Sequence, residues 1–197
     1  MTLTQGLVRM ALETITGPRR VAQQLMAAHL SREVLATAFA LVITLNAVLY
    51  GLTLLLAPPP AGTSIFLAQP VGYAVVEVVS LAGMIASLTF VGRLMGGAGR
   101  FEDVALLLIW LQALNAAVQA ASLILLVAIP PLSGLMSLVA MVIGFWILLN
   151  FIAEAHGYGT LLKAFGVFIL ALLALGFALS MLMTLAGVSP EGLIGNV

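Results

Sequence analysis

The chain has 197 residues, of which 63% are hydrophobic and only 7% are charged, and its mean hydropathy is +1.24. Soluble domains carry about a quarter charged residues, so this composition excludes an ordinary water-soluble globule and indicates a protein that crosses a membrane several times. Seven basic and seven acidic residues balance, which argues against a nucleic-acid partner. The absence of cysteine excludes disulfides and thiolate metal sites.

The first segment, residues 1–32, is amphipathic rather than membrane-spanning. Its apolar residues recur at helical spacing: Leu3, Leu7, Met10, Ala11 and Ile15. Gly17 and Pro18 break this helix, and Pro18 suits the first turn of a second helix. Two interpretations remain open. These helices lie on the membrane surface with their arginines beside the head groups, or they pack beneath the membrane bundle as a cytosolic cap.

Five apolar runs follow, each close to the roughly 20 residues that a helix needs to cross a bilayer. They cover about 33–56, 70–93, 102–129, 133–153 and 161–187. Ser31 is a good N-cap for the first run, and proline or glycine clusters separate the runs. The predicted fold class is therefore all-α, with amphipathic surface helices in a cytosolic segment at 1–32, a bundle of five transmembrane helices over 33–187 and a short exterior tail at 188–197.

The positive charges predict how the bundle is threaded. All seven lie on one side of a five-span arrangement: Arg9, Arg19, Arg20, Arg32, Arg93, Arg100 and Lys163. The loops on the opposite side carry none. Because cytoplasmic loops are enriched in Lys and Arg, we expect the N-terminus to be cytoplasmic and the C-terminus to be exterior.

Glu77 is the one ionisable residue well inside a predicted span. No Lys or Arg lies within a span to pair with it, so we expect it to be protonated or bound to neighbouring amides. At a rise of 1.5 Å per residue, Glu77 lies about 10 Å from the outer end of its span. Asn46, Asn115 and Gln119 fall at a similar depth, and Gln112 precedes Asn115 by three residues on the same helix.

These depths predict an intramembrane polar layer of Asn46, Glu77, Asn115 and Gln119. The layer could bind a proton or a substrate, or its hydrogen bonds could simply fix how the helices pack. We favour the structural interpretation, because neither a second acidic residue nor a cation is expected at that depth.

A charged hairpin between the second and third spans is the other candidate site. It contains Arg93, Arg100, Glu102 and Asp103, which we interpret as a contact loop for a partner on the cytosolic side. Acidic residues in a first helical turn also stabilise the helix N-terminus, which is the simpler explanation for Glu102 and Asp103. The two histidines form no zinc pattern, and we expect neither a metal nor a cofactor.

Three short motifs resemble those of the Yip-domain family of small five-pass membrane proteins. They are Gly17-Pro18, the turn Gly97-Ala98-Gly99-Arg100-Phe101-Glu102-Asp103, and Gly157-Tyr158. The resemblance covers nearly the whole chain. It implies the five-span topology, and in eukaryotes such proteins are associated with Rab-type GTPases and vesicle traffic. Eukaryotic members carry an Asp-Leu-x-Gly-Pro type of segment where this chain has Thr16-Gly17-Pro18, so it is more similar to the bacterial branch, whose activity is generally unassigned.

We therefore expect a non-enzymatic scaffold or interaction protein of a bacterial inner membrane. Its partners would be the lipid bilayer and a second copy or another membrane protein. The alternative is a small transporter or channel component that uses Glu77 and its amide layer. An enzyme is less well supported, because intramembrane catalysis normally needs at least two convergent reactive groups.

Overall fold

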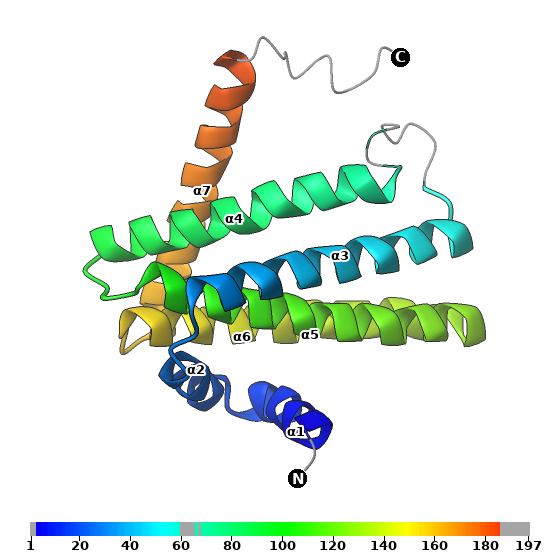
Figure 1. Ribbon diagram of the computed structural model, residues 1–197, viewed down its shortest axis with the longest axis horizontal. Helices are drawn as coiled ribbons and strands as arrows, with labels where there is room; N and C mark the ends of the chain where they lie inside the picture. The colour runs from blue at the N-terminus through cyan, green and yellow to red at the C-terminus, as the bar shows by residue number, and fades with distance from the viewer. Residues whose placement is uncertain (1–2, 60–65, 67, 186–197) are drawn as a thin grey trace.

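The structure is a computed structural model that describes residues 3–59, 66 and 68–185, and these residues form seven helices (Figure 1). The helices are α1 (Leu3–Thr16), α2 (Pro18–Ala27), α3 (Arg32–Leu56), α4 (Pro70–Leu94), α5 (Phe101–Ala128), α6 (Pro130–His156) and α7 (Leu161–Leu185). The described part contains no strand, which confirms the all-α fold class. The predicted exterior tail at 188–197 lies outside the described residues.

Helix boundaries follow from local sequence. Ser31 caps α3 by accepting a hydrogen bond from the Val34 amide at 3.4 Å. Gly17 separates α1 from α2, and Pro18 opens α2. Gly157 ends α6 in the left-handed conformation, with φ at 72°, a backbone geometry that favours glycine.

Five helices are long and apolar enough to cross a membrane, as the sequence predicts: α3, α4, α5, α6 and α7. The main difference in their boundaries concerns α6. It covers Pro130–His156, three residues more at each end than the predicted run of 133–153. Its two prolines occupy the first turn, where the backbone amide that proline lacks has no partner within the helix.

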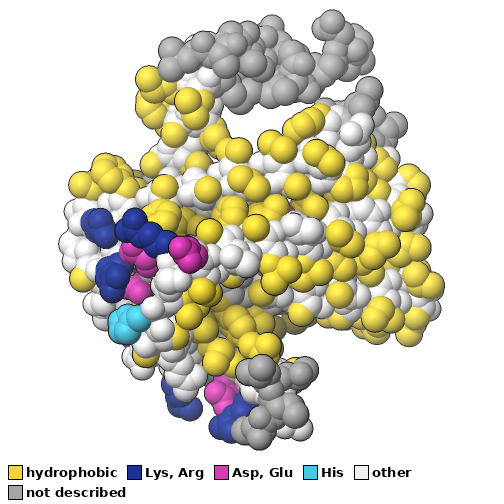
Figure 2. All heavy atoms as spheres, viewed as in Figure 1, with side chains coloured by type: hydrophobic (Ala, Val, Ile, Leu, Met, Phe, Trp, Pro, Cys, Tyr) yellow, Lys and Arg dark blue, Asp and Glu magenta, His cyan; other side chains and the backbone are white. Residues whose placement is uncertain are grey.

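The buried core lies where these helices meet, and α5 contacts α3, α4 and α6. Leu88, Leu107, Phe151 and Val167 are almost completely buried. The outer faces are apolar as well, and Figure 2 shows hydrophobic side chains over most of the bundle surface. A water-soluble protein could not expose this surface, whereas hydrocarbon chains can cover it.

Helix α7 differs in direction from the other four long helices, because it runs across α4 rather than alongside it (Figure 1). Its first half packs on α4 and α6 through the buried residues Ala164, Val167 and Ala171. Its second half makes few contacts, and Leu173 and Phe177 are 64% and 73% exposed. Only the first half of α7 therefore belongs to the core.

The N-terminal segment packs against the bundle, chiefly through α2. Val21 and Ala22 of α2 are fully buried against α5 and α6. Arg19 donates a hydrogen bond to Asn150 at 3.2 Å. In addition, the Gln23 amide donates to Glu154 at 2.7 Å.

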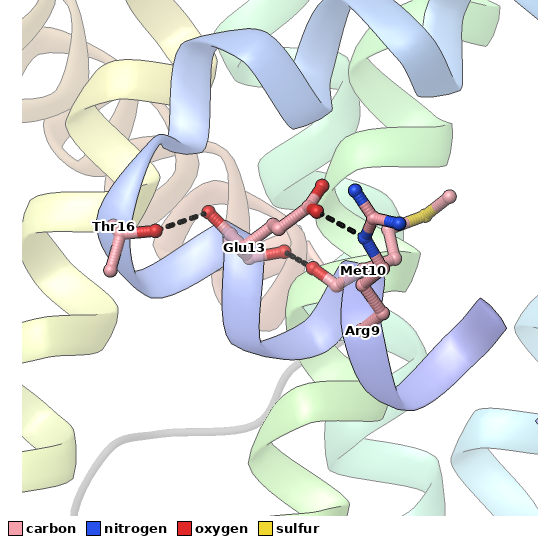
Figure 3. Close-up of polar contacts among 5 residues, drawn as sticks. Arg9, Met10, Glu13 and Thr16 are labelled. Atoms are coloured by element: carbon pink, nitrogen blue, oxygen red, sulfur yellow. Dashed lines mark hydrogen bonds and ion pairs between the residues drawn. The ribbon is translucent and has the colours of Figure 1, made fainter. Parts of the chain in front are cut away.

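Helix α1 is attached less extensively than α2. The indole N–H of Trp110 in α5 donates to the hydroxyl of the buried Thr14 at 3.1 Å. On the outer side of α1, Arg9 and Glu13 form an exposed ion pair at 2.6 Å (Figure 3). Leu7 and Leu12 remain more than half exposed, so α1 also presents an apolar face of its own.

Charged side chains gather at one end of the bundle (Figure 2). At this end α3 and α5 begin, α4 and α6 finish, and α7 begins. We call it the charged end, and it includes Arg32, Arg93, Arg100, Glu102, Asp103 and Lys163.

Candidate functional site

At the charged end, the α4–α5 turn and the α6–α7 turn pack into one junction. His156, the last residue of α6, is 3% exposed, and its ring lies against the backbone of Gly92, Gly97 and Gly99. A Cβ atom on these three glycines would lie 2.0, 2.7 and 2.6 Å from the nearest His156 side-chain atom. Because real side-chain contacts are longer, only glycine fits at these positions beside the histidine.

Tyr158 completes this glycine–histidine junction. Its hydroxyl donates to the Gly92 carbonyl oxygen at 2.6 Å, and its ring stacks on that of His156 with centroids 5.4 Å apart. The Lys163 ammonium lies 4.5 Å from the Tyr158 ring centroid, in a cation–π contact. Burial raises the pKa of Tyr158, so the phenol remains a hydrogen-bond donor at neutral pH. The Ala98 amide donates to the His156 carbonyl at 3.2 Å.

Two residues of the predicted contact loop are engaged within the protein. The Arg93 guanidinium donates to the Gly99 carbonyl at 2.9 Å and thereby closes the turn onto α4. Glu102 accepts two hydrogen bonds from Arg32, at 3.1 and 2.8 Å, and this ion pair joins α5 to the start of α3. The other two loop residues make no side-chain hydrogen bond within the described part of the chain: Arg100, which is exposed, and Asp103, which is half-buried.

The polar layer forms around Glu77. Asn46 of α3 and Gln112 of α5 both donate to the same oxygen of Glu77, the second at 3.3 Å. The Asn115 amide donates in turn to the Gln112 side-chain oxygen at 3.0 Å. Asn46 and Glu77 are 4% and 7% exposed, so the contact between α3 and α4 is buried. The structure thus brings together three of the four predicted layer residues through Gln112.

Gln119 lies apart from this network. With Asn115 it lines an open groove of about 560 Å³ between α5 and α6, which also includes Tyr73 of α4. Within the described residues Gln119 makes no hydrogen bond to Glu77 or to its partners. Gln119 follows Gln112 by seven residues, so it lies on nearly the same face of α5 but about 10 Å further along the helix axis, beyond the level of Glu77.

Sequence reasoning did not identify the glycine–histidine junction. The motifs at Gly97–Asp103 and Gly157-Tyr158 are recognisable in the sequence, but nothing in their spacing indicates that they touch. The available signal was the density of glycine, since residues 92–99 include four glycines, and glycine allows the close approach of another part of the chain. Among the described residues, no group of three His, Cys, Asp or Glu side chains could hold a metal ion.

Gly92→Ala should destabilise the junction, because the new methyl group overlaps the His156 ring. We expect the free energy of unfolding to fall by about 1–3 kcal/mol, measured by thermal unfolding in detergent. His156→Ala removes the overlapping ring, so the double variant should be more stable than the sum of the two single losses predicts.

Gly159→Ala is the matched control, because a Cβ atom at Gly159 meets no atom within 4 Å. It should leave stability nearly unchanged. Strictly additive effects of Gly92→Ala and His156→Ala would contradict the proposed contact.

Glu77→Gln should leave stability unchanged, because glutamine keeps an oxygen that can accept from Asn46 and Gln112. Glu77→Leu leaves both amide donors without that acceptor, and we expect a loss of about 1 kcal/mol. Unfolding in detergent measures both, with Val78→Leu on the exposed side of α4 as control. If Glu77→Gln destabilised as strongly as Glu77→Leu, the carboxyl group itself would be required.

Comparison with known proteins gives one finding. The family model described as Yip1 domain matches residues 12–183, which extends from within α1 almost to the end of α7. No curated protein and no solved structure matches the chain. The match covers the end of α1, all of α2, both polar sites and nearly all of the five long helices. The chain therefore belongs to the Yip1-domain family of membrane proteins.

Proposed function

We propose that this protein is a non-enzymatic membrane scaffold whose charged end binds another protein. The observation that carries the proposal is the concentration of exposed charge at the end of the bundle where α2 is attached (Figure 2). The contact surface comprises Arg20 and Gln24, which are exposed one turn apart on α2, together with Arg100. Such a surface suits a partner that carries acidic and hydrogen-bonding groups.

The internal contacts support a rigid platform beneath this surface. His156 and Tyr158 connect the ends of α4 and α6 with the beginnings of α5 and α7. The ion pair of Arg32 with Glu102 adds the beginning of α3. A surface held by such contacts loses little conformational entropy when a partner binds. We further propose a bacterial inner membrane as the location, with the charged end in the cytoplasm, because basic residues favour that side.

Transport through the Glu77 layer is a second candidate that no specific observation favours. One Glu77 oxygen accepts two interhelical hydrogen bonds, which is the arrangement expected of a packing contact. The comparison of Glu77→Gln with Glu77→Leu separates the two roles if flux is measured alongside stability.

Photoreactive residues introduced at Gln24 and Arg100 should yield the same discrete protein adduct in native membranes. Val127, which is 70% exposed at the opposite end of α5, is the control position and should yield none. With the photoreactive residue at Gln24, combining Arg20→Glu with Arg100→Glu should reduce the adduct by about tenfold, since reversing contact charges disfavours association. Adducts at Val127 alone, or an unchanged yield in the charge-reversed variant, would contradict the proposal.

Single cysteines test the orientation directly, because the native chain contains none. Gly159→Cys lies at the charged end, and Ala128→Cys lies at the opposite end of α5. In intact bacterial cells, a membrane-impermeant maleimide should label Ala128→Cys and should label Gly159→Cys only after the membrane is opened. The reverse pattern would mean that the charged end faces outward.

A further inference from the structure

A groove between α3, α4 and α5 opens at the charged end and has a volume of about 430 Å³. Its walls are apolar: Leu35 and Phe39 from α3, Ala82 and Ile85 from α4, and Ile109 from α5. Only its mouth is polar, where the ion pair of Arg32 and Glu102 lies. The groove therefore has one charged end and one hydrocarbon-like interior, which is the division found in a phospholipid.

A smaller cavity of about 50 Å³ adjoins the mouth and shares Leu35 and Glu102 with the groove. Arg100 and Asp103 also line it. The volume exceeds what a single water molecule needs, so the cavity has room for a small charged group. The mouth and the cavity together present two guanidinium groups, two carboxylates and the imidazole of His29.

We propose that this groove binds a membrane phospholipid whose head group is a phosphate bearing a primary ammonium. One acyl chain lies between Phe39, Ala82 and Ile109, and the phosphate contacts the arginines. The ammonium donates hydrogen bonds to Glu102 and Asp103 in the small cavity.

The charges at the mouth select this head group. Arg32 is 88% exposed and uses two of its nitrogens on Glu102, so further N–H groups remain for a phosphate. An anionic head group without an amine would place its charge beside two carboxylates and offer them no positively charged donor. A trimethylated ammonium likewise has no N–H to donate. Basic pockets between helices bind lipid head groups in the same way, here with acidic residues added.

Native mass spectrometry of the delipidated full-length protein tests the site. The probes are phosphatidylethanolamine, phosphatidylcholine and phosphatidylglycerol with identical acyl chains. We expect phosphatidylethanolamine to be retained at about tenfold lower concentration than phosphatidylcholine, the effect of one charge-assisted hydrogen bond. Arg32→Gln should lower this retention. Equal retention of the first two lipids, or tighter binding of phosphatidylglycerol, would overturn the proposal.

Ala82→Phe tests the groove without altering a charge. Ala82 is small and exposed, so a phenylalanine there fills the space of the acyl chain. It should abolish the selective adduct while the protein stays folded. Ala86→Phe is the matched control, because Ala86 is also exposed on α4 but does not line the groove. An Ala82→Phe protein that still binds phosphatidylethanolamine selectively would overturn the acyl-chain assignment.

Discussion

Hydrocarbon offers no hydrogen-bond partners, and this constraint accounts for the polar contacts inside the bundle. A side chain that would be hydrated in water must here find its partner on another helix. Glu77 does so by accepting from Asn46 and Gln112, which draws α3 and α5 toward α4 at one depth. Apolar helix faces are covered equally well by lipid and by other helices, so their burial does not favour one arrangement of the helices over another. Polar contacts and close packing between helices make that distinction.

The charged end is held together differently, by close backbone contact. Gly92, Gly97 and Gly99 let His156 approach to a distance that any side chain would prevent, and Tyr158 adds a hydrogen bond to the same backbone. The sequence suggests that Arg93 and Glu102 contact a partner, but in the structure both side chains bind other parts of the same chain. Arg100 stays exposed and makes no side-chain hydrogen bond within the described residues, so one short turn combines a structural part with an exposed part.

The sequence predicted the five spans well, because their length and hydropathy follow directly from the thickness of a bilayer. It also brought Asn46 and Glu77 to a common depth, because the rise per residue of a helix is fixed. It did not place Gln119 correctly, because Gln112 and not Gln119 lies at the level of Glu77, and the position of α5 along α4 depends on packing. The contact of His156 with its three glycines could not be predicted either, because these glycines lie about sixty residues earlier in the chain and no local pattern connects them with the histidine. The packing of α2 on the bundle also depends on a tertiary contact, the burial of Val21 and Ala22, which the sequence does not show.

The separation of His156 from its glycines also has a consequence for how the chain assembles during synthesis. The α4–α5 hairpin emerges from the ribosome well before His156 does. Its glycines at 92, 97 and 99 therefore have no histidine ring packed against them at that stage. Only after α6 has been made can His156 and Tyr158 reach Gly92. The charged end is thus completed late, and α7, which follows directly, packs against helices that have just been joined.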